Sequence, residues 1–334
     1  MRIALITDAW KPQINGVVTT LEQVTTLLRQ QGHELLIVHP GQFRTFPLPR
    51  YPEIRLAIAP ARRLKQQLTD FAPDAIHIAT EGTLGFAARR FCLRRRWRFT
   101  TSYHTQYAQY GRQYFRIPTR WSYAVLRRFH NAATRMLVPT PSVQRELRSR
   151  GFTNAVVWTR GVDTERFRPA AEKNLYHRPR PIFLFCGRVA REKNIEAFLH
   201  ADLPGTKVVI GDGPAMASLR PRHPHVVFTG FQTGDDLARH MAAGDVFVFP
   251  SRTDTFGVVM LEAMACGLPV AAYPVTGPID VVRPGVTGVL HEDIAIAAMQ
   301  ALLLDPRDCR AQALECSWDR CAAMFLDNLV PRAA

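Results

Sequence analysis

The feature that most constrains this 334-residue chain is a repeated alternation of short apolar segments with amphipathic ones. Residues 2–7 form an apolar strand, and residues 35–39 form the next one. Between them apolar residues recur at helical spacing: Val17, Val18, Leu21, Val24, Leu27 and Leu28. A strand–helix–strand unit joins parallel strands with a right-handed crossover almost without exception, so this start predicts a parallel sheet.

The alternation continues in two blocks, which the Pro- and Arg-rich residues 166–181 separate. The first block has further strands at 75–78, 99–102, 136–139 and 156–158 and helices at 84–92, 119–133 and 142–150. The second has strands at 182–186, 207–210, 226–229, 246–250 and 269–273, and helices near 196 and at 235–243, 258–266, 295–303 and 317–329. We therefore predict an α/β protein of two doubly wound, Rossmann-like domains, 1–166 and 180–314. Ligands of such sheets bind beyond the carboxyl ends of the strands.

The net charge of +15 falls almost wholly on the first block. Residues 1–160 hold 25 Lys and Arg against 8 Asp and Glu, which gives +17, whereas residues 161–334 hold 18 against 20, which gives −2. This asymmetry indicates a phosphate-rich partner, either an anionic membrane surface or a nucleic acid. The alternative is a solvated basic surface without a specific partner.

Membrane and export signals are not evident in the sequence. No apolar stretch approaches the roughly 20 residues that a transmembrane helix needs. The N-terminal apolar run ends at Asp8, which is too short for a signal peptide. We therefore expect a cytoplasmic protein, with its six cysteines reduced because they form no CxxC pair.

Two cations follow the first predicted strand of the second block, in the string GRVAREKN (187–194). Gly187 permits a tight turn directly after the strand, and Arg188 and Lys193 lie beside the predicted start of a helix. Cationic side chains at a helix N-terminus suit the binding of a diphosphate. The alternative is that both are ordinary surface residues.

A second loop with polar chemistry follows the fourth predicted strand of that block. It passes through Asp254 to Phe256 and Gly257, and a helix is predicted from Val258. The backbone N–H groups around Gly257 and Val258 would point at an anion. Glu262, one turn into the helix, could accept hydrogen bonds from ribose hydroxyls, unless it is a plain surface or core-edge residue.

Several strings resemble, in chain order, the retaining GT-B glycosyltransferases of family 4, the group with an E-x7-E motif. They are TDAWKPQINGVV (7–18), TSYHTQY (101–107), RGVDTERFRP (160–169), GRVAREKN (187–194), IGDGP (210–214), FTGF (228–231) and SWDRCAAMF (317–325). Asp254 and Glu262 stand eight residues apart, at the two acidic positions of the motif. The family fold has two facing Rossmann-like domains and a C-terminal helix, here 317–330, that crosses back onto the first domain.

The resemblance implies a role for each matching position of the second block. Arg188 and Lys193 would hold the donor diphosphate and neutralise the leaving group. Glu262 would bind the ribose hydroxyls. Asp254 would contact hydroxyls of the transferred sugar, and the backbone at 256–258, with Gly257 at its centre, would contact sugar and phosphate.

Two positions of the first block complete the implied site. Gly16 would let its loop approach the donor, and His104 would contact the transferred sugar near its reacting face. A lone histidine after a strand is otherwise often a hydrogen-bonded core residue. The family most often has Glu where this chain has Asp254, which sets the carboxylate back by roughly 1.5 Å and bears on sugar selectivity.

Many transferases hold a divalent metal with an Asp-x-Asp sequence, and this chain contains none. We therefore expect no metal and no cofactor. Positive potential from Arg188, Lys193 and the helix that begins near Val258 would instead stabilise the departing nucleoside diphosphate. The resemblance implies retention of the anomeric configuration. Since no carboxylate nucleophile is evident, our hypothesis is a same-face route in which the leaving phosphate assists deprotonation of the acceptor.

Aromatic residues are dense within 97–123, where Arg112, Arg116 and Arg120 interleave with them. They are Trp97, Phe99, Tyr103, Tyr107, Tyr110, Tyr114, Phe115, Trp121 and Tyr123. The string RRFCLRRRWR (89–98) lies just upstream. Tyr and Trp beside Arg are typical of membrane interfaces with anionic headgroups. We therefore expect a membrane-lipid acceptor such as diacylglycerol and peripheral attachment at the inner face of the membrane. The alternative is that the aromatics fill the core and the arginines are solvated.

The favoured donor is a UDP-hexose, and the alternative is a GDP-mannose-dependent α-mannosyltransferase acting on a lipid or a soluble glycan. A nucleic-acid-binding protein is disfavoured because no such module is recognisable. A nicotinamide-dependent dehydrogenase is disfavoured because DAWKPQING lacks G-x-G-x-x-G. Retention of Arg188, Lys193 and Glu262 argues against a member that has lost its activity.

Overall fold

The computed structural model describes residues 1–13, 15–48, 51–109, 112 and 116–333, and only the backbone of 51–53. The chain divides into two compact units. Unit 1 comprises Met1–Thr159 and Trp318–Ala334, and unit 2 comprises Arg160–Ser317. Unit 1 is therefore discontinuous in sequence, because its last helix comes after the whole of unit 2.

Unit 1 is built on a parallel sheet of six strands in the order β2-β1-β5-β6-β7-β8. The strands are β1 (Arg2–Ile6), β2 (Glu34–Val38), β5 (Ala75–Ile78), β6 (Thr100–Ser102), β7 (Arg135–Val138) and β8 (Ala155–Val157). Ile3 on β1 is paired with Leu35 on one side and with Ala75 on the other. The strand order reverses between β1 and β5, so the loops after these two strands lie side by side at the carboxyl edge of the sheet.

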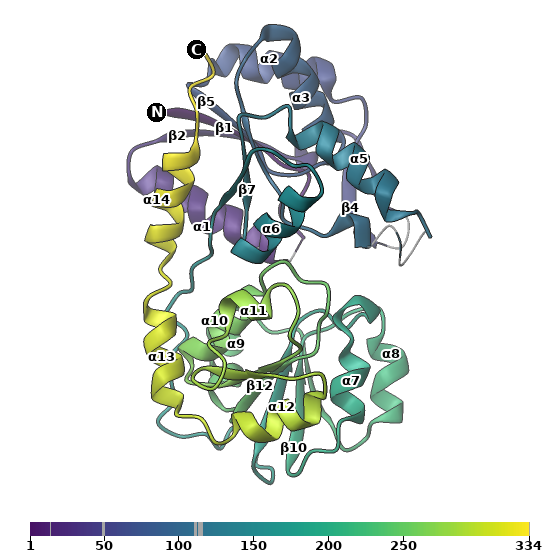
Figure 1. Cartoon of the computed structure of the whole chain (residues 1–334), viewed down its shortest axis with the longest axis vertical. Helices are drawn as coiled ribbons and strands as arrows, with labels where there is room; N and C mark the ends of the chain where they lie inside the picture. The colour runs from purple at the N-terminus through teal and green to yellow at the C-terminus, as the bar shows by residue number, and fades with distance from the viewer. Residues whose placement is uncertain (14, 49–50, 110–111, 113–115, 334) are drawn as a thin grey trace. The chain divides into compact units, whose positions relative to one another are not determined.

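Helices cover both faces of this sheet (Figure 1). They are α1 (Gly16–Gln30), α2 (Ala61–Phe71), α3 (Thr83–Arg95), α5 (Thr119–His130), α6 (Pro141–Ser149) and α14 (Trp318–Asn328). Helices α2, α3 and α5 share one apolar core with β1 and β5, to which Leu64, Leu84 and Phe129 contribute. Helix α14 packs against α1. A 3-10 turn (Pro40–Gln42) and an antiparallel hairpin, β3 (Thr45–Leu48) with β4 (Tyr51–Ala57), follow β2.

Unit 2 repeats the architecture with a parallel sheet in the order β11-β10-β9-β12-β13-β14. Its strands are β9 (Ile182–Cys186), β10 (Thr206–Ile210), β11 (Val227–Gly230), β12 (Val246–Phe249), β13 (Val270–Ala272) and β14 (Gly288–Leu290). Its helices are α7 (Ile195–His200), α8 (Met216–Leu219), α9 (Gly234–Ala242), α10 (Val258–Ala265), α11 (Pro278–Val281), α12 (Ile294–Ala301) and α13 (Pro306–Leu314). Buried apolar clusters on both faces of the sheet make it a sandwiched core. Here the strand order reverses between β9 and β12.

Two doubly wound parallel sheets and a C-terminal helix that returns to the first of them confirm the predicted fold class. The structure also contains elements that the apolar pattern did not predict: the β3–β4 hairpin, β14 and the helices α2, α8, α11 and α13. Across the described part of the chain, no helix combines the length and the apolar character that crossing a bilayer requires.

Candidate functional site

The loops after β9 and β12 meet at the carboxyl edge of the unit 2 sheet, where the strand order reverses. The Lys193 ammonium lies 2.6 Å from Oδ1 of Asp254, although 61 positions separate the two residues. Asn194 Nδ2 donates to the Pro250 carbonyl at 3.1 Å, and the Thr253 hydroxyl donates to a carbonyl of the first loop at 3.4 Å. The structure therefore brings the first-loop cation and the second-loop carboxylate into one cluster.

The two oxygens of the Asp254 carboxylate are used differently. Oδ1 is paired with Lys193, and these side chains are 17% and 25% exposed. Oδ2 is buried and accepts no hydrogen bond from any described residue. A buried carboxylate oxygen without a donor costs free energy, so its surroundings suit a ligand group that donates a hydrogen bond.

Gly187 and Arg188 directly follow β9, and the loop after β10 packs tightly against them. A Cβ on Gly211 would lie 2.0 Å from the Gly187 carbonyl oxygen, so only glycine fits at position 211. Arg188 is half-buried in this turn. Lys193 ends a 3-10 turn (Arg191–Lys193), and α7, with six residues, starts only at Ile195. The first loop can therefore bind an anion with its cationic side chains, but not with the N-terminus of a long helix.

The second loop supplies the helix N-terminus. Gly257 is the N-cap of α10 with a φ of +85°, and a Cβ there would come within 2.9 Å of the Phe249 ring. Because the N-cap residue is a glycine, it has no side chain with which to cap this end of the helix. Phe256 is buried in the core, so it can offer a ligand only its backbone, as Val258 does at the first turn. Unsatisfied N–H groups at this position are suited to an anion.

Glu262 lies one turn into α10 and is half-buried. Its carboxylate receives no hydrogen bond and forms no ion pair within the described ranges. Burial raises the pKa of Glu262 from 4.5 to about 7. A carboxylate with unused acceptor capacity is suited to ligand hydroxyls, as the ribose role requires.

The two remaining candidates belong to unit 1. Gly16 is the first residue of α1, and the Asn15 side chain caps this helix by accepting from the N–H groups of Val17 and Val18 at 3.0 Å. A Cβ on Gly16 would meet no atom of the described residues within 4 Å, so packing against them does not require glycine there. His104 follows β6 and is buried. Its ring lies edge-on to the Trp158 indole, with centroids 5.8 Å apart and an interplanar angle of 67°.

Asp8 is a residue whose role sequence reasoning missed. Its buried carboxylate accepts from the N–H groups of Leu84 (3.0 Å) and Gly85 (3.3 Å) at the start of α3. The Thr80 and Thr83 hydroxyls donate to it as well, at 3.0 and 3.4 Å. Burial nevertheless raises the pKa of Asp8. This carboxylate ties the loop after β1, which leads to Gly16, to the loop after β5.

The aromatic residues of 97–123 divide between core and surface. Tyr110, Tyr114 and Phe115 lie outside the described residues. Phe99, Tyr103 and Tyr123 are core residues, whereas Tyr107 and Trp121 are 43% and 62% exposed. The expectation of an aromatic surface is therefore wrong for the core residues, whose rings fill the space beneath α5.

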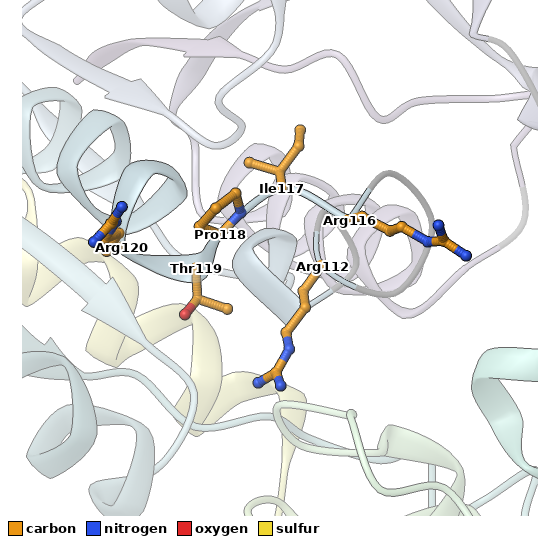
Figure 2. Close-up of a pocket in the computed structure, with 6 residues that line it drawn as sticks. All are labelled: Arg112, Arg116, Ile117, Pro118, Thr119 and Arg120. Atoms are coloured by element: carbon orange, nitrogen blue, oxygen red, sulfur yellow. The ribbon is translucent and has the colours of Figure 1, made fainter.

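Arg112 and residues 116–120 line a hollow of about 350 Å³. Figure 2 shows that Arg112, Arg116 and Arg120 point in different directions, so they do not converge on one ligand.

Helices α3 and α5 form one continuous surface. The rings of Phe86 and Phe129 meet edge to face at 4.9 Å, and Arg89 donates to two carbonyls at the end of α5. Residues 82–145 contain 13 arginines and no Lys, Asp or Glu. Large apolar side chains are exposed among these arginines: Phe86, Leu93, Ile117, Trp121 and Val125. We call this surface the α3–α5 face.

Two family models match the chain: "Glycosyltransferase Family 4" over residues 14–166 and "Glycosyl transferases group 1" over residues 180–305. A GDP-mannose-dependent alpha-mannosyltransferase of Mycobacterium tuberculosis is 32% identical over 87% of this chain and 83% of its own length. The alpha-monoglucosyldiacylglycerol synthase of Streptococcus pneumoniae is 26% identical over 92% of this chain and 79% of its own.

Among solved structures, sucrose-phosphate synthase from Thermosynechococcus elongatus superposes with a TM-score of 0.78 at 22% identity, covering 98% of this chain and 97% of its own. The two Rossmann-like units therefore have the GT-B fold. The chain belongs to glycosyltransferase family 4, and it is a hexosyltransferase.

Proposed function

We propose that this enzyme transfers a hexose from a nucleoside diphosphate sugar, with a UDP-hexose favoured, to a membrane lipid such as diacylglycerol. The observation that carries the proposal is the Lys193–Asp254 pair beside the uncapped start of α10. Arg188, Lys193 and the N–H groups at 257–258 hold the diphosphate. The unpartnered Oδ2 of Asp254 accepts from a hydroxyl of the transferred sugar. Glu262 accepts from the ribose hydroxyls.

In unit 1, we propose that His104 contacts the transferred sugar near the reacting face of that sugar. Gly16 leaves room for the donor, because no described residue occupies the space where its Cβ would stand.

Departure of the nucleoside diphosphate places negative charge on its terminal phosphate. In the proposed mechanism Arg188 and Lys193 stabilise this charge without a metal or a cofactor, as preorganised donors do in oxyanion sites. The acceptor oxygen attacks the anomeric carbon on the face that the phosphate leaves, and the phosphate takes the acceptor proton. The configuration is then retained, and an inverted product in an NMR assignment of the anomeric linkage would exclude this route.

A GDP-mannose-dependent mannosyltransferase is the second candidate function. It is favoured by the relative of that name that is 32% identical along most of its length. The contacts described for Asp254 and Glu262 concern sugar and ribose hydroxyls, and both donors carry these groups. A soluble glycan is the matching alternative for the acceptor.

The lipid acceptor and a peripheral position on an anionic membrane surface are supported by the α3–α5 face. Helices α3 and α5 carry seven arginines, residues 82–145 contain no acidic residue, and large apolar side chains stand among these arginines. Arginine is attracted to anionic headgroups, and Trp at an interface places its ring at headgroup level. The relative from Streptococcus pneumoniae carries diacylglycerol in its name.

A donor screen tests the proposal directly. The enzyme is incubated with UDP-glucose, UDP-galactose, UDP-glucuronate or GDP-mannose in EDTA, with and without diacylglycerol in vesicles, and nucleoside diphosphate release is measured. We expect release from one donor that rises with diacylglycerol and persists in EDTA. Lys193→Met should lower this release by at least about a hundredfold. Release from one donor irrespective of lipid would point to a soluble glycan, and no release from any donor would contradict the proposed donors.

Flotation with vesicles tests membrane attachment. Arg120→Ser and Trp121→Ser should each weaken binding to vesicles that contain phosphatidylglycerol, by about fivefold for the arginine because one basic residue near such a surface contributes roughly 1 kcal/mol. Arg220→Ser is the matched control, since Arg220 is an exposed arginine of unit 2. An equal loss in the control, or no binding by the unmodified enzyme, would contradict membrane attachment.

A further inference from the structure

The His104 ring is supported by a residue that no functional motif contains. Trp158 lies directly after β8 and is fully buried. Its indole meets the His104 ring edge to face at 5.8 Å. An aromatic pair of this kind has a preferred geometry and thereby restricts the rotation of both rings.

Trp158 is in turn held by the C-terminal helix α14. Its indole Nε1 donates to the Cys321 carbonyl at 2.9 Å, and its ring packs on Phe325 at 5.2 Å. The Cys321 thiol contacts the carbonyl of Thr159, the next residue in the chain, at 3.2 Å. Phe325 also meets the buried ring of His77 at 4.8 Å. The indole is therefore fixed by a helix that lies more than 150 positions later in the sequence.

We propose that Trp158 is a positioning residue for His104, and that α14 takes part in catalysis by holding Trp158 in place. The inference rests on the proposed function, in which His104 contacts the transferred sugar. If rotation of the His104 ring moves its nitrogen atoms away from the sugar by about 1 Å, turnover can fall by up to about a hundredfold. Trp158 blocks this rotation from the core side.

Two substitutions at position 158 separate the ring contact from the indole hydrogen bond. Trp158→Phe and Trp158→Leu both lose the N–H that binds the Cys321 carbonyl, but only Phe keeps an aromatic edge against His104. We expect Trp158→Leu to lower turnover by about tenfold with little change in donor KM, and Trp158→Phe to keep most of the turnover. If Trp158 only stabilised the fold, the loss of turnover in each variant would follow the fall in its melting temperature, and the aromatic ring of Phe would give no advantage beyond stability.

The matched control is Phe71→Leu. Phe71 ends α2, packs against the apolar core of unit 1 and carries the Arg2 guanidinium over its ring at 4.7 Å. No ring contact joins it to His104 among the described residues. We expect Phe71→Leu to lower the melting temperature and to leave turnover within about twofold.

The deciding measurement repeats Trp158→Leu in a His104→Ala background. We expect no further loss of turnover there, although the melting temperature still falls. A tenfold loss that persists in the His104→Ala background would overturn the inference and leave the proposed function intact. Unchanged turnover in His104→Ala alone would overturn the role of His104 in the proposed function, and the inference with it.

Discussion

Glu262 combines two properties that make its titration observable. It is half-buried on α10, and burial raises its pKa to about 7. Since the pKa in the folded chain lies above its ordinary value of 4.5, the folded state holds the proton more tightly than the unfolded state does. The charged form therefore costs stability, and this cost appears as the pH rises from 4.5 through 7.

We expect Glu262→Gln to remove this dependence. The stability of the variant relative to the unmodified enzyme should rise between pH 5 and pH 8, by up to about 3 kcal/mol, because Gln carries no charge to desolvate. Urea unfolding at both pH values measures the difference. The same stability difference at pH 5 and pH 8 would contradict the pKa of Glu262.

The same residue should couple donor binding to proton release. A carboxylate that accepts from two ribose hydroxyls must be ionised, and about half of the Glu262 side chains are protonated at pH 7. Calorimetric titration of a UDP-sugar in two buffers of different ionisation enthalpy should therefore show release of a fraction of a proton at pH 7. Glu262→Gln should release none, and release that persists in this variant would assign the proton to another group.

At the scale of elements, Asp8 connects β1 to α3. Its carboxylate occupies the N-terminus of α3, where a negative charge is stabilised by the helix dipole and by the first N–H groups. Space for it exists because position 82 is glycine: a Cβ there would lie 2.3 Å from Asp8 Cγ. The carboxylate also holds the loop that leads to Gly16.

We expect Asp8→Asn to destabilise unit 1 by about 2 kcal/mol. Both carboxylate oxygens accept hydrogen bonds, so an amide NH₂ group must face a donor on one side. Hydrogen exchange should quicken at the first turn of α3. Asp70→Asn, at an exposed position of α2, is the control and should leave exchange in α3 unchanged. Unaltered exchange in Asp8→Asn would show that the carboxylate does not hold this helix.

The elements that could be predicted from the sequence are those whose apolar pattern fits only one type of secondary structure. Buried parallel strands such as Val246–Phe249 read as continuous apolar runs, and they alternate with amphipathic helices. The β3–β4 hairpin was not predicted because a proline such as Pro47 argues against a strand. Helix α2 escaped because only Leu64 and Leu68 are buried on it.

The candidate site was predictable only as separate strings. GRVAREKN and the Asp254 loop follow predicted strands, so their place at the sheet edge could be inferred. That Lys193 would pair with Asp254, leaving one carboxylate oxygen unpartnered, depends on side-chain positions across 61 residues. The contacts of Asp8 with α3 and of Trp158 with α14 are of the same long-range kind. Spacing rules within one element cannot reveal them.

At the scale of the whole molecule, the return of α14 to unit 1 makes the stability of that unit depend on its last helix. Phe325 is fully buried, between the rings of His77 and Trp158. We expect Phe325→Ala to cost roughly 3–5 kcal/mol, as other deletions of buried aromatic rings do. Hydrogen exchange should quicken in β5 and β8 while β9 and β12 stay protected. Equal loss of protection in both units would contradict this assignment.

The discontinuity of unit 1 also has a consequence for the order of events on the ribosome. Residues 1–159 emerge first, but α14, which packs Phe325 against Trp158, is translated only after all of unit 2. Unit 2 is continuous from Arg160 to Ser317 and can complete its core while unit 1 still lacks one wall. The nascent N-terminal half therefore exposes the apolar surface around Trp158 until α14 has left the exit tunnel. Chaperones bind exposed apolar surface of this kind.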